Sequence, residues 1–492
     1  MPYRYGVYGM FGQSVGANAT QSDTTVVYFG TAPVNLVSGY KDAGIINNPV
    51  KINNLADAQR KIGYCGDYES YTLMEAVDAH FNNSLGNVGP IYVINVLDPD
   101  KHTGEAGTQA LSFVNNKVSF VSTNIILDSV SIEGKAKDTD YTVSYDYGTN
   151  VVTIRGTDDT KPLTGGVTVK YNTVDPTKVT KADIIGGVTS DGVHTGISAL
   201  ELVYNDNFDI PNILVAPGWS HIPDVYNALN AASSGINGHW DAVTICDLPV
   251  VDEDKKAVDT IEKAEKWKAD HGFTSERSKV CWPMAVGTSG KVFHISSMLA
   301  AATMKIDYEH DSVPMETAAN KEAPVIKQYF GANAVNNGFG QKDGSELTSK
   351  GITTVVAWAG KWVFWGDSTA AFEYGADNDN RDIFDTSLRM MMHITNDFQQ
   401  SHFADIDKPF TAALKDEILN QEQEKLDHYV SMGALIGNPT ISFLDVDNTY
   451  SDIVNGVFTW NIQITPSPMS KALICKVAYT TDGFTSLYGT TE

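Results

Sequence analysis

The sequence contains little cysteine, and its four cysteines are scattered over 492 residues. Zinc sites and redox motifs use closely spaced cysteines, and no such pair occurs here. Cys246, Cys281 and Cys475 lie inside apolar runs, whereas Cys65 stands in a polar stretch. This pattern predicts buried free thiols and suits a reducing cytosol.

Long hydrophobic segments are missing as well. No run of about 18 apolar residues occurs, so the sequence predicts no membrane-spanning helix. The opening MPYRYGVYGMFGQSVG lacks the apolar core of a signal peptide. We therefore expect no export by that route.

Basic residues are few, with 35 against 60 acidic residues and a formal net charge of −25. Such a charge disfavours nucleic acid and anionic membranes as partners. Copies of the chain also repel one another at low salt. Any assembly is expected to be salt-sensitive, because the screening length shortens to about 10 Å at 0.1 M salt.

Recognisable catalytic motifs are absent too. Residues 285–292 resemble a phosphate-binding loop, but the first glycine is missing and Val292 replaces the magnesium-binding hydroxyl. Residues 445–456 begin like a calcium loop but lack its glycine and its final glutamate. No HExxH pair or GxSxG elbow occurs, and His393 and His402 have the setting of structural histidines. The sequence predicts no enzyme activity, no cofactor and no metal site.

The chain is too long for a single core, so two to four domains are expected. Buried strands alternate with helices on both sides of a segment of short alternating strands, which predicts a discontinuous α/β core interrupted by an all-β insertion. The fold class is therefore multidomain α/β and α+β. The predicted order is an N-terminal arm (1–22), the first part of the α/β core (23–97), an inserted β-sandwich-like domain (98–183), the second part of the core (184–345), a C-terminal α+β domain (346–468) and a C-terminal arm (469–492).

Two boundaries rest on particular patterns. The polar, glycine- and asparagine-rich segment from 314 to 350 has little periodicity and predicts a linker. A tryptophan-rich hairpin over 353–365 follows it and is expected to open the C-terminal domain. Helices are predicted near 385–398 and 410–432, and an earlier one is predicted to begin after Asn54 as its N-cap.

The end of the chain carries the strongest signal for assembly. Residues 457–464 alternate apolar and polar side chains, which predicts a half-buried strand. Its apolar face consists of Phe458, Trp460, Ile462 and Ile464. Pro466 and Pro468 then prevent a tight hairpin, yet residues 473–479 are strand-like again. That second strand can fold back onto its own sheet or add to the edge of a neighbour's sheet.

The last domain resembles the tail sheath protein of contractile phage tails and related injection systems. The residues that carry this resemblance occur in the family's order and spacing: Leu388–Met390, Gly433–Gly437, Asp447–Thr449, Asp452–Ile453, Gly456–Val457 and Ile462–Pro468. Weaker blocks upstream extend the match to most of the chain outside residues 98–183. Two departures occur: Tyr5–Tyr8 stands where the family opens with Pro-Gly-Val-Tyr, and Ser470 or Lys471 stands where an acidic residue is expected.

The resemblance implies a structural subunit rather than an enzyme. Such subunits stack as hexameric rings around an inner tube, and the stack shortens and widens when it is triggered. The implied partners are further copies of the chain, the inner tail tube protein, and baseplate and tail terminator proteins. The implied location is a virion tail or a phage-tail-like particle such as an R-type bacteriocin, assembled in the bacterial host cytoplasm.

The resemblance also implies that terminal arms add strands to the last domain of an adjacent subunit. The residues expected in these intersubunit arms are Tyr3, Tyr5, Val7, Tyr8, Leu473, Ile474, Cys475, Val477 and Tyr479. Phe458–Ile464 is expected to stay in its own sheet and to accept a strand. Alternative hypotheses are an α/β enzyme and a glycan-binding surface protein that uses residues 98–183.

Overall fold

The computed structural model describes residues 20–487, and within them the centre of the molecule is an eight-stranded sheet. Its strand order is β19-β18-β14-β13-β12-β1-β3-β2, in which the two edge strands β19 and β2 are antiparallel to their neighbours and the other pairs are parallel. The strands are β1 (Thr20–Gly30), β2 (Pro49–Ile52), β3 (Val88–Asn95), β12 (Pro211–Val215), β13 (Val243–Asp247), β14 (Ser278–Cys281), β18 (Ile352–Trp358) and β19 (Lys361–Trp365). Val26 to Phe29 in β1 are fully buried, as expected for a parallel strand covered on both faces.

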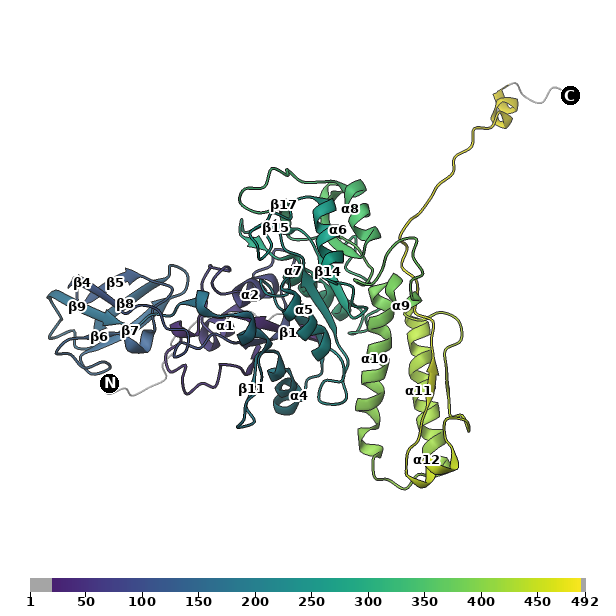
Figure 1. The fold of residues 1–492 in the computed structure, drawn as a ribbon, viewed down its shortest axis with the longest axis horizontal. Coiled ribbons are helices and arrows are strands. Elements are labelled where there is room, and N and C mark those ends of the chain that lie inside the picture. Colours follow the sequence, from purple (N-terminus) through teal and green to yellow (C-terminus); the bar gives the residue numbers. More distant parts are fainter. Residues whose placement is uncertain (1–19, 488–492) are drawn as a thin grey trace, which may run out of the picture.

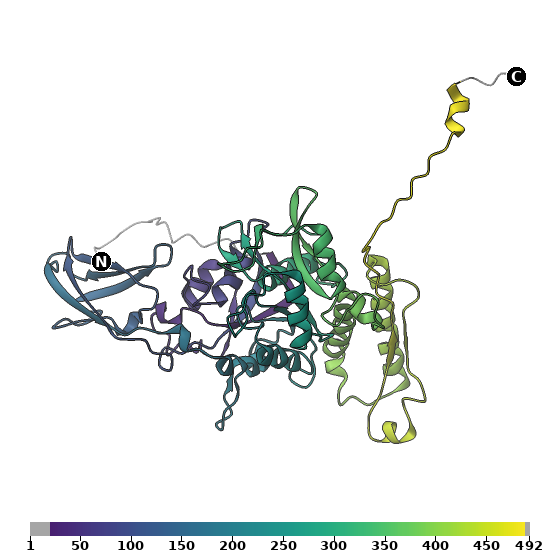
Figure 2. The same cartoon turned by 45° about the horizontal axis from the view of Figure 1, so that its top comes forward.

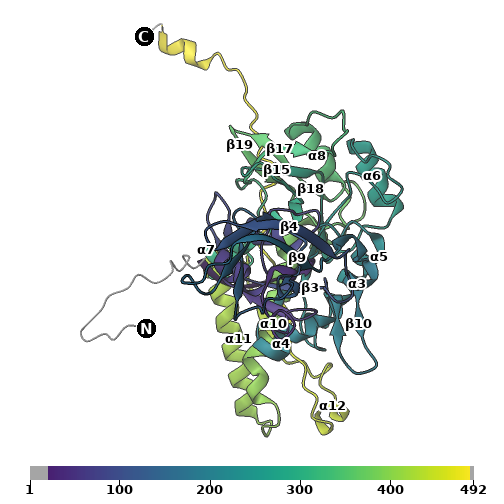
Figure 3. The same ribbon diagram turned by 90° about the vertical axis from the view of Figure 1, so that its left-hand side faces the viewer.

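Helices cover both faces of this main sheet. Figure 3 shows α7 on one side and α3 and α5 on the other. The helices of this part are α1 (Leu55–Lys61), α2 (Leu73–Phe81), α3 (Lys181–Ile185), α4 (Glu201–Asn207), α5 (Pro223–Ala232), α6 (Ile261–Asp270) and α7 (Ile295–Glu309). The predicted start of α1 is confirmed, because the Asn54 side chain accepts a hydrogen bond from the Asp57 backbone N–H at 2.8 Å.

An all-β unit leaves the main sheet after β3 and returns before β12 (Figure 1). Its strands form two three-stranded antiparallel sheets, β4-β9-β6 and β5-β8-β7. They are β4 (Gly107–Phe113), β5 (Lys117–Val121), β6 (Ser131–Ile132), β7 (Tyr141–Asp146), β8 (Val151–Gly156) and β9 (Gly165–Tyr171). The alternating side chains enclose a separate apolar core that includes Val152, Ile154 and Val169, so short strands of period two form this unit.

The β unit is docked firmly on the main body. Leu36, at the end of the 3-10 helix η1 (Val34–Leu36), is 1% exposed and packs into the core of the β unit. The neighbouring Asn35 donates two hydrogen bonds, to the carbonyl oxygens of Thr123 at 3.0 Å and Ile125 at 2.9 Å. The Tyr71 hydroxyl also donates to the Thr123 carbonyl oxygen, at 3.1 Å. The main body and the β unit therefore pack against each other and share hydrogen bonds, in addition to the two chain segments that connect them.

The segment predicted to be a linker is part of the fold, so that prediction is wrong. β17 (Val325–Tyr329) pairs with β15 (Met284–Gly287), which also pairs with β16 (Val292–Phe293). α8 (Gln341–Ser349) packs on β18, where a Cβ atom added at Gly344 would lie 2.7 Å from the Val356 side chain. The glycine that suggested a flexible linker instead permits a close helix-to-sheet approach.

The tryptophan-rich hairpin also lies elsewhere than predicted. β18 pairs in parallel with β14, with Val280 opposite Ile352, so β18 and β19 belong to the main sheet and not to the C-terminal part. The predicted boundary at residue 346 is therefore wrong. The cause is a pairing between strands that lie about seventy residues apart, which local periodicity does not report.

The C-terminal part is a long helical hairpin beside the main body (Figures 1 and 2). It consists of α9 (Asn380–Ile383), α10 (Asp385–His402), α11 (Ala412–Met432), α12 (Tyr450–Val454) and a two-stranded sheet of β20 (Thr440–Ser442) and β21 (Asn461–Gln463). Met390, Ile394, Leu426 and Tyr429 form the core between the two long helices. Minor elements are a hairpin of β10 (Gly187–Val188) and β11 (His194–Thr195), and the 3-10 helices η2 (Leu127–Ser129), η3 (Pro176–Lys178), η4 (Gly196–Leu200), η5 (Phe403–Asp405) and η6 (Asp482–Leu487).

The cysteines divide into two groups. Cys65, Cys246 and Cys281 are buried, whereas Cys475 is exposed, so the prediction of a buried thiol is wrong for Cys475. Burial raises the pKa of Cys65 and of Cys246 to about 12. In the described part of the chain, no helix combines the length and the apolar character needed to cross a bilayer.

We predict that Leu36→Ala loosens the β unit selectively. Removing a buried leucine side chain costs about 2–5 kcal/mol and leaves a cavity inside the core of the β unit. Hydrogen exchange should accelerate in residues 107–171 before it accelerates in the main sheet. The matched control is Leu229→Ala, which removes an equally buried leucine from the core of the main body. Equal acceleration of β-unit exchange in both variants would contradict firm docking through Leu36.

Candidate functional site

The two-stranded sheet near the C-terminus contains the residues predicted to accept a strand. β21 pairs antiparallel with β20, with Ile441 opposite Ile462, and a further bridge joins Leu435 to Pro466. The predicted alternation is present: Phe458, Trp460, Ile462 and Ile464 are half-buried, whereas Thr459 and Gln463 are exposed. The ladder is shorter than predicted, because only Asn461–Gln463 pairs as a strand.

Beyond the end of the ladder, aromatic side chains pack against one another. The Phe458 ring stacks on Phe410 with 3.6 Å between ring centroids, and Trp460 contacts Phe443 at 5.5 Å. Within residues 20–487, β20 and β21 pair only with each other. The outer edge of β20 contacts α11, where the Ile441 N–H donates to the Gln423 side chain at 3.3 Å, so the open edge of this sheet belongs to β21. Two-stranded sheets are marginally stable alone, and a third strand with an apolar face would stabilise this one.

The C-terminal arm projects from the body as an extended segment (Figures 1 and 2). Four of its predicted contact residues are more than 80% exposed: Leu473, Ile474, Val477 and Tyr479. Cys475 is exposed as well. Between residues 469 and 481 the described chain forms no helix or strand, and it does not fold back onto its own sheet. The other predicted arm residues, Tyr3, Tyr5, Val7 and Tyr8, lie outside the described residues.

Buried ion pairs fix the helical hairpin to the main body through α10. The Arg389 guanidinium pairs with Asp307 of α7, and the Lys279 ammonium of β14 pairs with Asp385. Both partners of the first pair are at least nine-tenths buried. The Thr24 hydroxyl donates to the same Asp307 carboxylate at 2.9 Å. Local sequence patterns do not report these pairs, because each pair joins elements far apart in the sequence. Arg389 enters the sequence analysis only within the block Leu388–Met390 that carries the resemblance.

Polar contacts also join the two long helices of the hairpin. Lys425 of α11 pairs with Asp397 of α10 at 2.6 Å. His402 lies 3.0 Å from Asp405 and 2.9 Å from Glu422, and His393 lies 3.1 Å from the Tyr429 hydroxyl. Burial lowers the pKa of His393. Both histidines thus have the structural surroundings that the sequence predicted.

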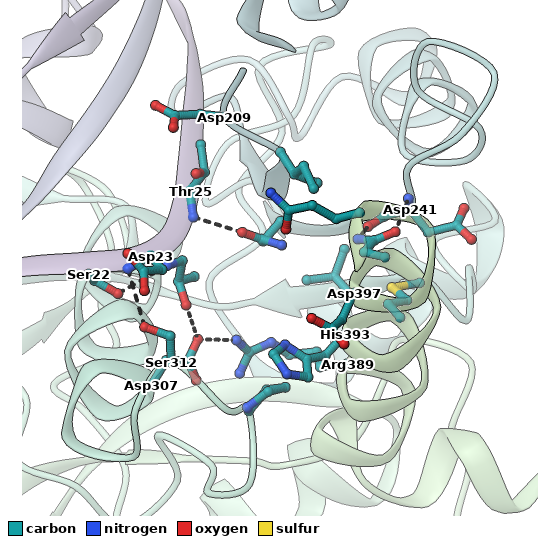
Figure 4. A pocket seen from close by; sticks show the side chains of 18 of the residues that line it. Ser22, Asp23, Thr25, Asp209, Asp241, Asp307, Ser312, Arg389, His393 and Asp397 are labelled. Carbon is teal, nitrogen blue, oxygen red and sulfur yellow. Dashed lines mark hydrogen bonds and ion pairs between the residues drawn. The ribbon is translucent and has the colours of Figure 1, made fainter. Parts of the chain in front are cut away.

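A polar cavity of about 500 Å³ lies between the start of β1 and α10 (Figure 4). Its walls include Asp23, Asp241, Asp397 and Arg389, and Figure 4 shows the Arg389 side chain directed toward Asp307. Lys51 at the wall is paired with Asp209 at 2.6 Å. Within the described part of the chain, no group of three or more His, Cys, Asp or Glu side chains could hold a metal ion. Across this cavity Arg389 pairs with Asp307, and the Asn396 side chain hydrogen-bonds to the Asp241 backbone, so its polar contacts join the body to the hairpin.

The carboxyl ends of the parallel strands, where many α/β enzymes bind ligands, hold a buried charge cluster. His294 lies 2.9 Å from the Glu75 carboxylate and also donates its backbone N–H to it at 2.6 Å. Asp247 at the end of β13 accepts hydrogen bonds from the backbone N–H and hydroxyl of Ser296. Glu75 and Asp247 are 1% and 3% exposed.

The protonation of this cluster follows from its surroundings. Burial alone lowers the pKa of His294, but the adjacent Glu75 carboxylate outweighs it and the pKa rises to about 9. Burial raises the pKa of Asp247 to about 6, although His294 and Ser296 oppose the change. At neutral pH His294 is thus a half-buried cation paired with Glu75, which ties α2 to the start of α7.

The chain is similar in sequence and fold to the sheath proteins of contractile tails. It is 25% identical over 479 residues to the tail sheath protein of Burkholderia phage BcepMu, covering 94% of this chain and 93% of the relative. It is 24% identical over 304 residues to the major tail sheath protein of Serratia phage KSP20, covering 60% and 70%. Both relatives are named as tail sheath proteins and neither as an enzyme, in agreement with the resemblance that the sequence carries. A search against family models found no match.

Solved structures show the same fold over nearly the whole chain. A chain of the anti-feeding prophage baseplate has a TM-score of 0.56 at 13% identity, covering 98% of this chain and all of that one. The sheath complex of an extracellular contractile injection system in its contracted state has a TM-score of 0.55 at 12% identity, covering 98% and 99%. The sheath tail protein of Listeria innocua has a TM-score of 0.50 at 13% identity, covering 92% and 93%. The predicted mixed α/β class is confirmed by this fold.

We predict that breaking the buried pair between α10 and α7 strongly destabilises the chain. Arg389→Met and Asp307→Leu each leave a buried charge without its partner, which costs about 3–5 kcal/mol. The double variant removes both charges and should lose less than the sum of the single variants. Urea unfolding measures the three changes. The control is Lys266→Ala, which breaks an exposed pair with Asp270 worth about 0–1 kcal/mol. Additive losses in the double variant would contradict direct coupling.

We also predict a pH dependence carried by His294. Its folded pKa of about 9 lies above the ordinary value of 6.5, so its stabilising contribution is complete below pH 6.5 and is lost as pH rises through 9. The loss should amount to about 2–3 kcal/mol. Asp247 titrates below this window, because its pKa is about 6. Unfolding free energies of the wild type and of His294→Gln, measured from pH 6.5 to 9.5, should converge. A constant difference across that range would contradict the assignment.

Proposed function

We propose that this protein is a structural subunit of a contractile tail sheath. It polymerises as stacked hexameric rings around an inner tube, and the stack contracts to drive the tube through a cell envelope. The observation that carries this proposal is a sequence similarity to a phage tail sheath protein over 94% of the chain, combined with an exposed apolar arm. The other partners are baseplate and tail terminator proteins. The subunit acts in a virion tail or phage-tail-like particle assembled in the host cytoplasm.

The C-terminal arm has the chemistry of a donated strand. In an extended conformation Leu473, Cys475, Val477 and Tyr479 share one face, because side chains alternate along a strand. All four are exposed in the single chain, which leaves their apolar surface in water. Pairing would bury that face and add backbone hydrogen bonds worth about 1 kcal/mol each.

The acceptor is the sheet of β20 and β21 in a neighbouring copy. The open edge of β21 supplies unpaired backbone groups, and the apolar face of Phe458, Trp460, Ile462 and Ile464 is only half-buried. A donated strand would extend this small sheet to the size at which sheets become stable. A second donated strand is proposed from the N-terminal arm, through Tyr3, Tyr5, Val7 and Tyr8.

Contraction requires neighbours to change orientation while they remain connected. The buried pairs at α10 and the docking of the β unit hold each subunit together as a stiff body. Residues 472–481 are extended and exposed, so they can serve as the connection between bodies. In this mechanism the bodies rotate and the arms keep their strands paired.

The prediction that tests this function concerns the arm alone. A variant that lacks residues 472–492 should keep the circular dichroism spectrum and unfolding midpoint of the wild type but should fail to form rings or tubes. Val477→Asp with Tyr479→Asp should also fail, because charges then meet the acceptor's apolar face. The matched control is Ile474→Asp, which places a charge on the opposite face of the arm. Negative-stain microscopy in moderate salt provides the readout, and tubes from the truncated variant would contradict strand donation.

A further inference from the structure

The root of the C-terminal arm is held on the main body by one lysine. The Lys471 ammonium donates hydrogen bonds to the Ser368 hydroxyl at 2.8 Å and to the Ile383 carbonyl oxygen at 2.6 Å. It also forms an ion pair with the Asp367 carboxylate at 3.0 Å. The three partners lie between the end of β19 and the start of α10. This lysine therefore crosses from the end of the helical hairpin to the segment that follows the main sheet.

Two aromatic rings complete the surroundings of this ammonium. Its nitrogen lies 4.6 Å from the centroid of the Phe372 ring and 4.8 Å from that of Phe384. A cation at such distances is attracted by the negative faces of aromatic rings. Asp367 is 14% exposed, and burial raises its pKa although Lys471 acts in the opposite direction. A carboxylate, a hydroxyl, a carbonyl oxygen and two rings thus meet one primary ammonium.

The residues on either side of Lys471 show that this contact sets where the arm leaves the body. Ser467 is still tied to the hairpin, because its backbone N–H donates to the Ala434 carbonyl oxygen and its hydroxyl to that of Gly433. From Ala472 to Phe484 every described residue is exposed. Lys476, a second lysine on the arm, forms no hydrogen bond or ion pair within the described residues. Within residues 467–481, Lys471 is therefore the last side chain that hydrogen-bonds to the body.

We propose that Asp367, Ser368, Phe372, Ile383 and Phe384 form an ammonium-binding site whose ligand is Lys471 of the same chain. This site fixes the point and direction from which the arm leaves the main body. For the assembly, this inference rests on the proposed strand donation. Through this site the arm is attached to the segment that follows the main sheet as well as to the hairpin. When the body moves, the arm therefore moves with it and pulls on the neighbouring copy that holds the strand.

The anchoring can be measured on the unassembled protein. Cys475 is exposed while the other three cysteines are buried, so one nitroxide can be attached four residues beyond Lys471. A second nitroxide is placed at Lys266→Cys on α6, whose native side chain is 75% exposed. Double electron–electron resonance should give a distance distribution about 1.4-fold broader for Lys471→Met than for the parent, because the free segment before Cys475 doubles in length when it begins at Ser467 and its spread grows with the square root of length.

Two further variants test whether any broadening of the distance distribution comes from the loss of this site. Asp367→Asn leaves the arm sequence intact and should broaden the distribution in the same direction. Lys476→Met removes an arm lysine that lies outside the site and should leave the distribution unchanged. Circular dichroism checks that each variant is folded. An unchanged distribution in both Lys471→Met and Asp367→Asn would overturn the ammonium site.

The assembly experiment separates this inference from the proposed function. Lys471→Met keeps the entire arm and should still form tubes, but its critical concentration should rise about three- to tenfold because a fixed origin lowers the entropic cost of binding. Tubes formed by the chain lacking residues 472–492 would overturn the proposed strand donation by the C-terminal arm, while the resonance result would still decide the ammonium site. An unchanged critical concentration in Lys471→Met, beside a broadened distribution, would overturn the site's role in assembly.

Discussion

Two buried ion pairs fix the position of the helical hairpin, which contains the acceptor sheet and leads to the C-terminal arm. Lys279–Asp385 and Arg389–Asp307 join α10 to the main sheet and to α7, and every later element follows from the direction of α10. Burying four charged groups is expensive, and the expense is offset only when each charge keeps its partner. The pairs therefore act as an orientation constraint on the hairpin. The orientation of the hairpin in turn sets the positions of the acceptor sheet and of the root of the arm.

The sequence pattern predicted the elements that depend on local periodicity. The helix capped by Asn54, the short strands of the β unit and the two long helices appear near their predicted places. The errors concern partners distant in sequence. The hairpin of β18 and β19 was assigned to the C-terminal part because its pairing with β14 leaves no local trace. The contacts of Arg389 and Lys471 likewise depend on residues more than eighty positions away.

Cys475 shows a second reason why a local sequence pattern can predict burial wrongly. The apolar residues around it resemble a buried strand, and the same pattern would serve a strand that is buried only inside another subunit. Within one chain these side chains remain exposed, and the small sheet of β20 and β21 keeps an open edge on β21. In the interior, Arg389 pairs with Asp307, and His294 and His402 contact carboxylates. The exposed apolar arm and the open edge of β21 are thus the two surfaces that strand donation would use.

The β unit at the far end of the body has a mechanical consequence. It projects well beyond the main sheet, and Leu36 and Asn35 prevent it from swinging independently (Figure 1). A projection that is fixed at its base behaves as a lever, so its displacement grows with distance from the axis of rotation. A modest turn of the body therefore becomes a wide sweep of strands β4 to β9. The outermost loops of the subunit would travel farthest without any change in their own fold.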